Sequence, residues 1–292
     1  MNRVALVTGA SRGLGECIAR RLHAAGYRVA LADVRLEGVQ RLAMELDSSG
    51  TSAVAIELDV RNKADFVRAR DLLAAQIQGF FDGPVDHLFA LPLLASHVNR
   101  RVDRKNVAVV SPDSGRLRLA ERWGGTDVLV NNAGVSKVAA LMDITPEEFD
   151  ESMAINLRGT FVACQVFGAH FAERGFGRIV NIASLAGQNG GTATGAHYAA
   201  AKGGVATLTK VFARELAPQG VTVNSISPGP LDLPVVRETV APERLEQILK
   251  MIPAGTLGAP EYIADSVLLL IADHASSVTG ACWDINGGLF MR

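Results

Sequence analysis

A tyrosine and a lysine four positions apart are the first residues in this sequence that could do chemistry. Tyr198 and Lys202 fall within an expected helix, 197–216, so both side chains project from one face of it. A tyrosine with its ordinary pKa of about 10 is a poor base at neutral pH, but a neighbouring ammonium group favours the phenolate. The spacing therefore predicts a tyrosine that acts as a general acid and base, with the lysine as its charged neighbour.

Two further polar residues could complete such a site. Ser184 comes just after an expected strand, 178–182, and its hydroxyl could hold the oxygen of a substrate. Asn156 lies on a long expected helix, 146–173, where it could position a water that relays protons to Lys202. A tyrosine four residues before a lysine is common on surface helices, so the prediction depends on what surrounds the pair.

A glycine-rich turn near the start of the chain predicts a phosphate-binding loop. The expected strand 3–7 gives way to a helix at three glycines, and the free N–H groups of a helix N-terminus bind a pyrophosphate. Glycine spacing alone is weak evidence, and an ordinary turn between a strand and a helix is the alternative. The residues expected to meet the nucleotide here are Gly9, Ser11, Arg12, Gly13, Leu14 and Gly15.

An acidic residue follows at the distance that a dinucleotide requires. Asp33 ends the expected strand 27–33, 18 residues after Gly15, and could accept hydrogen bonds from an adenosine ribose. A carboxylate there would repel a 2′-phosphate, which favours NAD over NADP. Arg12 favours NADP instead, because a guanidinium beside the loop could pair with that phosphate. The alternative role for Asp33 is an acid near the N-terminus of the next helix.

Strands and helices alternate along most of the chain, which predicts an α/β fold: a doubly wound, Rossmann-type sheet of seven parallel strands covered on both faces. The expected strands are 3–7, 27–33, 53–58, 127–132, 178–182, 221–226 and 282–285. The expected helices after the glycine loop are 36–46, 63–78, 146–173, 197–216, 243–250 and 260–272.

Composition excludes several classes of protein. The chain has 292 residues, 48% hydrophobic and 20% charged, and a net charge of −1, so neither nucleic acid nor an anionic membrane surface is an expected partner. Cys17, Cys164 and Cys282 are far apart, which indicates neither a disulfide framework nor a thiolate zinc site, and no metal site is predicted. These cysteines fit a reducing, cytoplasmic location, and the apolar run at the N-terminus is too short for the core of a signal peptide.

Taken together, these motifs resemble the short-chain dehydrogenase/reductase family, and its 3-oxoacyl reductase branch in particular. The resemblance covers residues 1 to about 70 and about 121 to 292. It rests on the order and spacing of the glycine loop 8–15, Leu58-Asp59-Val60, Asn131-Asn132-Ala133-Gly134, Asn156, Ser184, the segment 198–202, Asn224 and the segment 227–230.

The resemblance implies hydride transfer between a nicotinamide and the carbon of a ketone or secondary alcohol. By position, it makes Tyr198 the general acid/base, Ser184 the group that stabilises the substrate oxygen, and Asn156 part of the proton relay. It also implies that Lys202 binds the nicotinamide ribose and lowers the pKa of Tyr198.

The same resemblance assigns further cofactor contacts. Asp59 would meet the adenine amino group, Val60 the adenine face, and Asn131 the adenosine ribose region. The nicotinamide amide would meet the segment from Pro228 through Gly229 to Leu231. Leu233 stands where the family often has a threonine, so one contact to the cofactor is lost or replaced. The last strand packs at a subunit interface in many members, which implies a homodimer or homotetramer.

An inserted segment, 75–120, interrupts the alternation within one domain that otherwise spans 1–292. Val60 and Asn131 are 71 residues apart, whereas a strand–helix–strand unit needs roughly 30. Parts of the segment resemble ribose-phosphate diphosphokinase, without that family's phosphoribosyl loop, so no kinase chemistry is implied. We expect an insertion between the third and fourth strands, with a helix near 91–101 and a strand near 107–110. His87 and His97 match no strong metal-ligand pattern, and a solvated loop is preferred there.

The sequence therefore predicts an NAD(H)-dependent oxidoreductase that acts on a small-molecule secondary alcohol or ketone. Two alternatives stay open. One is an NADP(H)-dependent 3-oxoacyl thioester reductase, for which Arg12 is the motivating residue. The other is a nucleotide-binding scaffold that does not turn over. The substrate pocket is expected to be apolar, with residues such as Leu233, Val235 and Met251 along the loop and helix at 231–252.

Overall fold

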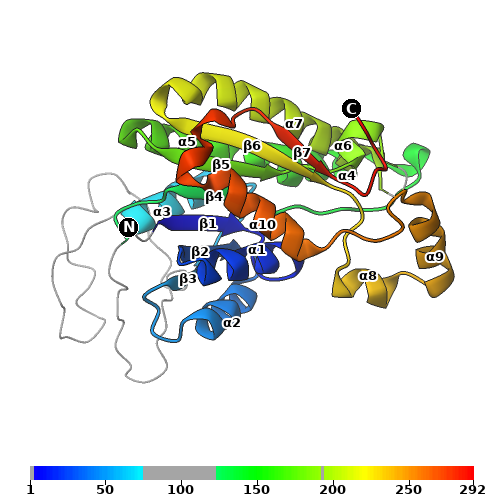
Figure 1. Ribbon diagram of the computed structural model, residues 1–292, viewed down its shortest axis with the longest axis horizontal. Helices are drawn as coiled ribbons and strands as arrows, with labels where there is room; N and C mark the ends of the chain where they lie inside the picture. The colour runs from blue at the N-terminus through cyan, green and yellow to red at the C-terminus, as the bar shows by residue number, and fades with distance from the viewer. Residues whose placement is uncertain (1–2, 75–122, 192–193) are drawn as a thin grey trace.

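The computed structural model describes residues 3–74, 123–191 and 194–292. Its centre is a seven-stranded sheet in the order β3-β2-β1-β4-β5-β6-β7, and every pair of neighbours is parallel (Figure 1). This confirms the predicted fold class. The strands are β1 (Val4–Thr8), β2 (Arg28–Asp33), β3 (Ala53–Glu57), β4 (Val128–Asn131), β5 (Gly177–Ile182), β6 (Val221–Pro228) and β7 (Cys282–Ile285).

The central strands are buried on both faces, which explains their nearly continuous apolar sequences. Successive side chains of a strand point to opposite faces of the sheet. In β1, Ala5 and Val7 belong to one hydrophobic cluster, whereas Leu6 belongs to the cluster on the other face. The sheet therefore separates two cores, and each core must be closed by helices.

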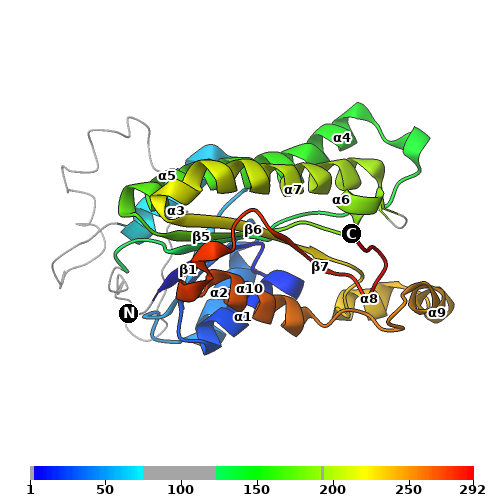
Figure 2. The same ribbon diagram turned by 45° about the horizontal axis from the view of Figure 1, so that its top comes forward.

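Three helices close the first core: α1 (Gly13–Ala24), α2 (Leu36–Leu46) and α10 (Pro260–Ile271). They lie together on one side of the sheet in both ribbon views (Figure 2). The buried residues of α2 are Val39, Leu42 and Ala43, whose spacing places them on one face of the helix.

The second core lies under α3 (Lys63–Ala74), α5 (Gly159–Arg174) and α7 (Ala196–Leu216). Its largest fully buried side chains are Phe66, Phe167 and Phe171. The helix α7 runs along this face and carries Tyr198 at its N-terminal end (Figure 2). The packing of this core therefore fixes α7 against the sheet.

We expect Phe167→Ala to lower the free energy of unfolding by about 3–5 kcal/mol, because the ring is fully buried and its removal leaves a cavity. Phe149→Ala is the matched control, since that ring is 41% exposed and its loss should cost less than about 1 kcal/mol. Urea unfolding of both variants measures the difference. Equal losses would contradict the assignment of Phe167 to the core.

The long helix expected over 146–173 is divided in the structure. It consists of α4 (Pro146–Met153), a π-helical segment η4 (Ala154–Arg158) and α5. A single π turn inserted in an α-helix is typical of functional sites, and Asn156 lies inside this one. Hydrophobic periodicity cannot distinguish such a turn from continuous helix, so the sequence did not predict it.

Several short elements complete the fold. Two helices that the sequence did not predict are α6 (Ala186–Asn189) and α8 (Pro234–Thr239); α9 (Pro242–Met251) was expected. The 3₁₀ turns are η3 (Leu141–Asp143), η5 (Ala217–Gln219) and η6 (Asp273–Ser277). Both α8 and α9 project beyond the carboxyl ends of the strands (Figure 1).

The predicted insertion 75–120 lies outside the described residues, and so do its expected helix, its expected strand and the residues His87 and His97. Among the helices of the described ranges, none is long and apolar enough to cross a membrane. Within the same ranges, no three His, Cys, Asp or Glu side chains come together as a group that could hold a metal ion.

Candidate active site

The carboxyl ends of the strands open into a cleft of about 900 Å³, which is within the usual size range of ligand pockets. The strand order reverses between β1 and β4, and ligands of open α/β sheets bind at this point. Residues at or just after the carboxyl ends of six strands line the cleft: Gly9, Asp33, Asp59, Asn132, Ser184 and Gly229. The sheet therefore brings together the sites that the sequence predicted separately.

The glycine loop forms a close turn at the start of α1. Gly9 has φ +67°, a left-handed conformation that favours glycine, and Gly13, with φ +59°, begins the helix. A Cβ on Gly15 would lie 2.1 Å from the carbonyl oxygen of Gly9, so only glycine fits there. The N-cap residue, Arg12, makes no capping hydrogen bond, which leaves the first N–H groups of the helix available to a ligand. This turn fits a pyrophosphate.

A hydrogen bond between Ser11 and Asp33 ties the glycine loop to the end of β2. The backbone N–H of Ser11 donates to Asp33 Oδ2 over 3.2 Å, and both side chains are buried. The other oxygen of Asp33 accepts the backbone N–H of Arg35 over 2.9 Å, and the Arg35 Nε lies 3.5 Å from it. Asp33 lines the cleft but is also engaged with the loop and with a cation. Asp33 therefore supports the loop, and it lies in the cleft where the ribose contact was expected.

The turn after β3 forms the part of the cleft where the adenine is expected. Asp59 and Val60 line it, as predicted, and Arg61 lies beside them. The Arg61 guanidinium contacts both carboxylate oxygens of Asp59, with a shortest distance of 2.7 Å, and this hydrogen bonding holds the pKa of Asp59 below its ordinary value. The Asp59 carboxylate is therefore kept ionised and already has a cationic partner.

Asn131 lies under the cleft. Its side-chain amide donates to Asn181 Oδ1 over 2.8 Å, and Asn181 in turn donates to Thr209 Oγ1 over 2.9 Å. Asn132, Ala133 and Gly134 line the cleft instead. A contact of Asn131 with the adenosine ribose region would therefore need its backbone, because its side chain is engaged in this buried chain of hydrogen bonds.

Tyr198, Ser184 and Lys202 face the same part of the cleft. The Nζ of Lys202 lies 5.8 Å from the centre of the Tyr198 ring and donates to the carbonyl oxygen of Ile182 over 2.6 Å. Burial lowers the pKa of Lys202 to about 8, so the amine is still mostly protonated at neutral pH.

The pKa of Tyr198 differs from the prediction. Burial raises it above the ordinary value, and a hydrogen bond with Ser184 acts in the opposite direction but does not prevail. The lowering that was expected from Lys202 is not found, because desolvation of the phenolate dominates and the ammonium group is directed at Ile182.

Asn156 is completely buried in the π-helical segment. Its side chain contacts the backbone of Val135 twice, at 3.0 Å as acceptor and 3.0 Å as donor, and also donates to the backbone oxygen of Ser152 over 3.1 Å. The side-chain amide is therefore engaged with the loop after β4 and with α4, so a water relay would have to use the backbone carbonyl of Asn156.

Comparison with known proteins decides the family. A model described as short chain dehydrogenase matches residues 3–90, and one described as Enoyl-(Acyl carrier protein) reductase matches residues 116–290. An acetoacetyl-CoA reductase from Rhizobium meliloti is 35% identical to this chain, over 99% of both sequences. The chain belongs to the short-chain dehydrogenase family. As a member, it is an oxidoreductase.

Two other relatives agree with this assignment. A 3-oxoacyl-[acyl-carrier-protein] reductase from Staphylococcus aureus is 32% identical, over 100% of this chain and 99% of its own. The crystal structure of a short chain dehydrogenase from Bacillus anthracis superposes with a TM-score of 0.76 at 25% identity, over 100% of this chain and 98% of that one. The comparisons give no support to the resemblance of the inserted segment to ribose-phosphate diphosphokinase.

The structure of this short-chain dehydrogenase also shows what the sequence reasoning missed. Arg35 and Arg61 line the cleft beside Asp33 and Asp59, and each lies two residues beyond its acid. That repeated Asp-x-Arg spacing was visible in the sequence. Gly134 was named in a motif but given no role, and a Cβ there would lie 2.7 Å from Asn156 Oδ1 and 3.6 Å from Lys202 Nζ.

The nicotinamide end, expected at Pro228, Gly229 and Leu231, lies next to Ser184. All three residues line the cleft, and Leu233 and Val235 continue the wall. A Cβ on Gly229 would lie 2.8 Å from the Cα of Asn286, so this loop packs closely on the turn after β7. Leu231, Leu233 and Val235 give this side of the short-chain dehydrogenase cleft an apolar surface, which fits a substrate with a hydrocarbon portion.

Proposed function

We propose that this chain transfers a hydride between NAD(H) and a secondary alcohol or ketone, with Tyr198 exchanging the proton. The observation that carries the proposal is the convergence of Tyr198, Ser184 and Lys202 in the same cleft as the glycine loop. The close turn at Gly9 and Gly15 and the acid at the end of β2 suit a dinucleotide. A nicotinamide dinucleotide supplies the hydride acceptor or donor when it is bound.

The proton balance follows from the side chains. In alcohol oxidation, the Ser184 hydroxyl holds the substrate oxygen, the Tyr198 phenolate accepts the hydroxyl proton, and the substrate carbon loses its hydride. In ketone reduction, the Tyr198 hydroxyl donates the proton to the same oxygen. The Lys202 ammonium lies 5.8 Å from the centre of the Tyr198 ring, and its pKa of about 8 leaves it mostly charged at neutral pH.

We expect Ser184→Ala to shift the pH dependence of alcohol oxidation to higher pH. The base form of Tyr198 is the active one, so the rate rises as pH passes the tyrosine pKa. The Ser184 hydrogen bond lowers that pKa, and its loss must raise it. The rate at neutral pH should also fall about 100-fold, the usual effect of removing a group that stabilises a developing oxyanion. Thr207→Ala, on the exposed side of α7, is the control.

The cofactor preference rests on Asp33. We expect Asp33→Asn to raise the ratio of kcat/KM for NADP over NAD about 10- to 100-fold, because a like-charge contact costs on the order of a few kcal/mol. The asparagine keeps an oxygen for the Ser11 N–H, so the loop should stay in place. Glu37→Gln, an exposed acid at the start of α2, is the control. An unchanged ratio would contradict a ribose role for Asp33.

A second candidate is an NADP(H)-dependent 3-oxoacyl thioester reductase. Two of the relatives carry names of that substrate class, acetoacetyl-CoA reductase and 3-oxoacyl-[acyl-carrier-protein] reductase. Arg12 lines the cleft and makes no ion pair with a described residue, so it is available to a 2′-phosphate. Arg12→Ala should weaken NADP binding in this case and leave NAD binding unchanged.

One experiment separates these candidates. The protein is titrated with NADH and NADPH, and absorbance of the reduced nicotinamide is followed with secondary alcohols, simple ketones and acetoacetyl-CoA. Turnover of alcohols with NAD supports the first proposal, and turnover of acetoacetyl-CoA with NADPH alone replaces it by the second. Binding without turnover on the whole panel would favour the third possibility, a nucleotide-binding scaffold.

The remaining expectations are part of the same proposal: one domain with an insertion at 75–120, a cytoplasmic location, and a homodimer or homotetramer. Light scattering on the purified protein measures the oligomeric state. Removal of residues 79–115 tests whether the insertion contributes to assembly. If it does, the oligomer should dissociate in the shortened protein.

A further inference from the structure

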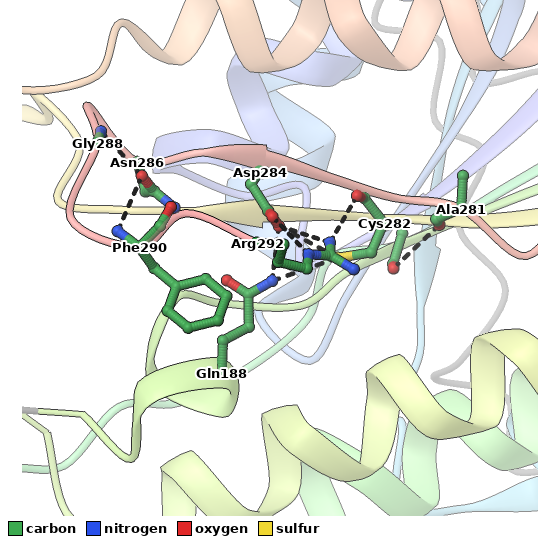
Figure 3. Close-up of polar contacts among 9 residues, drawn as sticks. Gln188, Ala281, Cys282, Asp284, Asn286, Gly288, Phe290 and Arg292 are labelled. Atoms are coloured by element: carbon green, nitrogen blue, oxygen red, sulfur yellow. Dashed lines mark hydrogen bonds and ion pairs between the residues drawn. The ribbon is translucent and has the colours of Figure 1, made fainter.

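The segment after β7 folds back along its own strand. Asn286 is buried and directs the turn: its Oδ1 accepts the backbone N–H of Gly288 over 3.0 Å, and its Nδ2 donates to the carbonyl oxygen of Phe290 over 3.1 Å (Figure 3). Gly287 and Gly288 have positive φ values, which permit the reversal. Arg292, the last residue of the sequence, is thereby returned to the middle of β7.

Arg292 is held there by three hydrogen bonds. Its Nε donates to Asp284 Oδ2 over 2.7 Å. Its Nη2 donates to Asp284 Oδ1 over 2.9 Å and to the carbonyl oxygen of Cys282 over 2.8 Å. A two-point contact between a guanidinium and a carboxylate fixes direction as well as distance. The Asp284 carboxylate is only 21% exposed, so its orientation is well defined.

Asp284 also reaches across to another element. Its Oδ1 accepts the side-chain N–H of Gln188 over 2.6 Å, and Gln188 belongs to α6 (Figure 3). Gln188 has a second, weaker contact to the Cys282 sulfur at 3.9 Å. Within the part of the chain that the structure describes, these are the only side-chain hydrogen bonds that join α6 to the sheet.

Helix α6 is the support of the catalytic serine. The N–H of Ala186, its first residue, donates to Ser184 Oγ over 3.1 Å, and the N–H of Gly187 donates to the Ser184 carbonyl oxygen over 3.0 Å. Gly187 packs directly on the catalytic helix, because a Cβ there would lie 2.5 Å from the backbone carbon of Lys202. Any shift of α6 therefore moves the Ser184 hydroxyl relative to Tyr198 and Lys202.

The contacts of Asp284 form a continuous path from the end of the sequence to the active site. We propose that Arg292 and Asp284 are positioning residues, which hold α6 through Gln188 and thereby set the place of the Ser184 hydroxyl in the hydride-transfer reaction. This inference rests on the proposed function. It differs from a mere contribution to stability, because it predicts an effect on the chemical step and on the proton transfer at Tyr198.

Three single variants test the path: Arg292→Gln, Asp284→Asn and Gln188→Ala. Each should lower kcat about tenfold and leave the Kd of NADH unchanged, because a small misplacement of a group that holds the substrate reduces the rate without removing the cofactor site. The double variant Arg292→Gln with Gln188→Ala should lose no more activity than either single variant, since both act through one path. Arg292→Lys should recover part of the rate.

The pH profile separates positioning from simple electrostatics. Loss of the Ser184 contact raises the pKa of Tyr198, so all three variants should move the oxidation profile to higher pH, as Ser184→Ala does. A purely electrostatic effect would shift the pH profiles of Arg292→Gln and Asp284→Asn in opposite directions. It would leave the profile of Gln188→Ala unchanged, because that substitution removes no charge. Shifts of opposite sign would overturn the proposal.

Hydrogen exchange gives a readout that does not need turnover. The amides of residues 184–191 should exchange faster in all three variants, while those of α1 should not change. Arg21→Gln is the matched control, because Arg21 forms an exposed ion pair with Asp265 between α1 and α10, far from α6. Unchanged exchange at 184–191 would overturn the proposal, whether or not the protein is active. If the unmodified protein binds NADH but converts no substrate, the proposed function fails and exchange alone decides whether α6 is held by this path.

Discussion

Tyr198→Phe is expected to lower kcat by about 10²- to 10⁴-fold, the range of effects seen when a general acid or base is removed. The phenylalanine ring keeps the packing of α7 beside Lys202 and removes only the hydroxyl that exchanges the proton. The Kd of NADH should stay within a few-fold of its original value, because the glycine loop and Asp33 are untouched. Steady-state kinetics and a fluorescence titration of NADH measure the two quantities.

Tyr262→Phe is the matched control, since this tyrosine lies on α10 and is 61% exposed. It should change neither quantity. A Tyr198→Phe variant that retains most of its activity would remove the tyrosine from the mechanism. A loss of activity on a measurable substrate would in turn exclude the scaffold without turnover.

Gly15→Ala is expected to abolish measurable NADH binding, with a Kd at least about 100-fold higher, and to lower the Tm by several degrees. The added Cβ would lie 2.1 Å from Gly9 O, 2.5 Å from Asn132 Nδ2 and 2.8 Å from Gly9 C. Two of these atoms are backbone, so the loop itself must move. A displaced loop no longer presents its N–H groups to a pyrophosphate.

Gly50→Ala provides the control for the loss of a glycine. Gly50 has φ +70° but no described atom within 4 Å of an added Cβ, so the change costs backbone strain alone. It should lower the Tm slightly and leave the Kd of NADH unchanged. Calorimetry and NADH titration of both variants make the comparison, and an unaltered Kd in Gly15→Ala would contradict the loop as the phosphate site.

The sheet was predictable because its strands are buried on both faces. Runs such as Val128-Leu129-Val130 leave little alternative to a central parallel strand, and the carboxyl ends of such strands must share one edge. Asp33, Asp59 and Ser184 each lie at or just after the carboxyl end of a strand, and the structure brings them to one cleft. The positions of Tyr198 and Lys202 followed from helical spacing alone.

Other features of the site depend on tertiary contacts that no local pattern carries. The amide pattern Asn131-Asn132 does not indicate which side chain faces the cleft, because the strand ends between them and the alternation of faces stops there. The role of Asn156 depends on a π turn, which has the same composition as an α-helix. The raised pKa of Tyr198 results from desolvation, which only the packed structure defines.

The buried hydrogen-bond chain Asn131–Asn181–Thr209 also restricts which folded arrangement is possible. It joins β4, β5 and α7, and its members have almost no contact with solvent. A slip of α7 by one residue along β5 would leave these amide and hydroxyl groups without partners in an apolar core, at a cost of several kcal/mol. Apolar side chains tolerate such a slip far better. These hydrogen bonds therefore select the one alignment of α7 along β5 that brings Tyr198 level with Ser184.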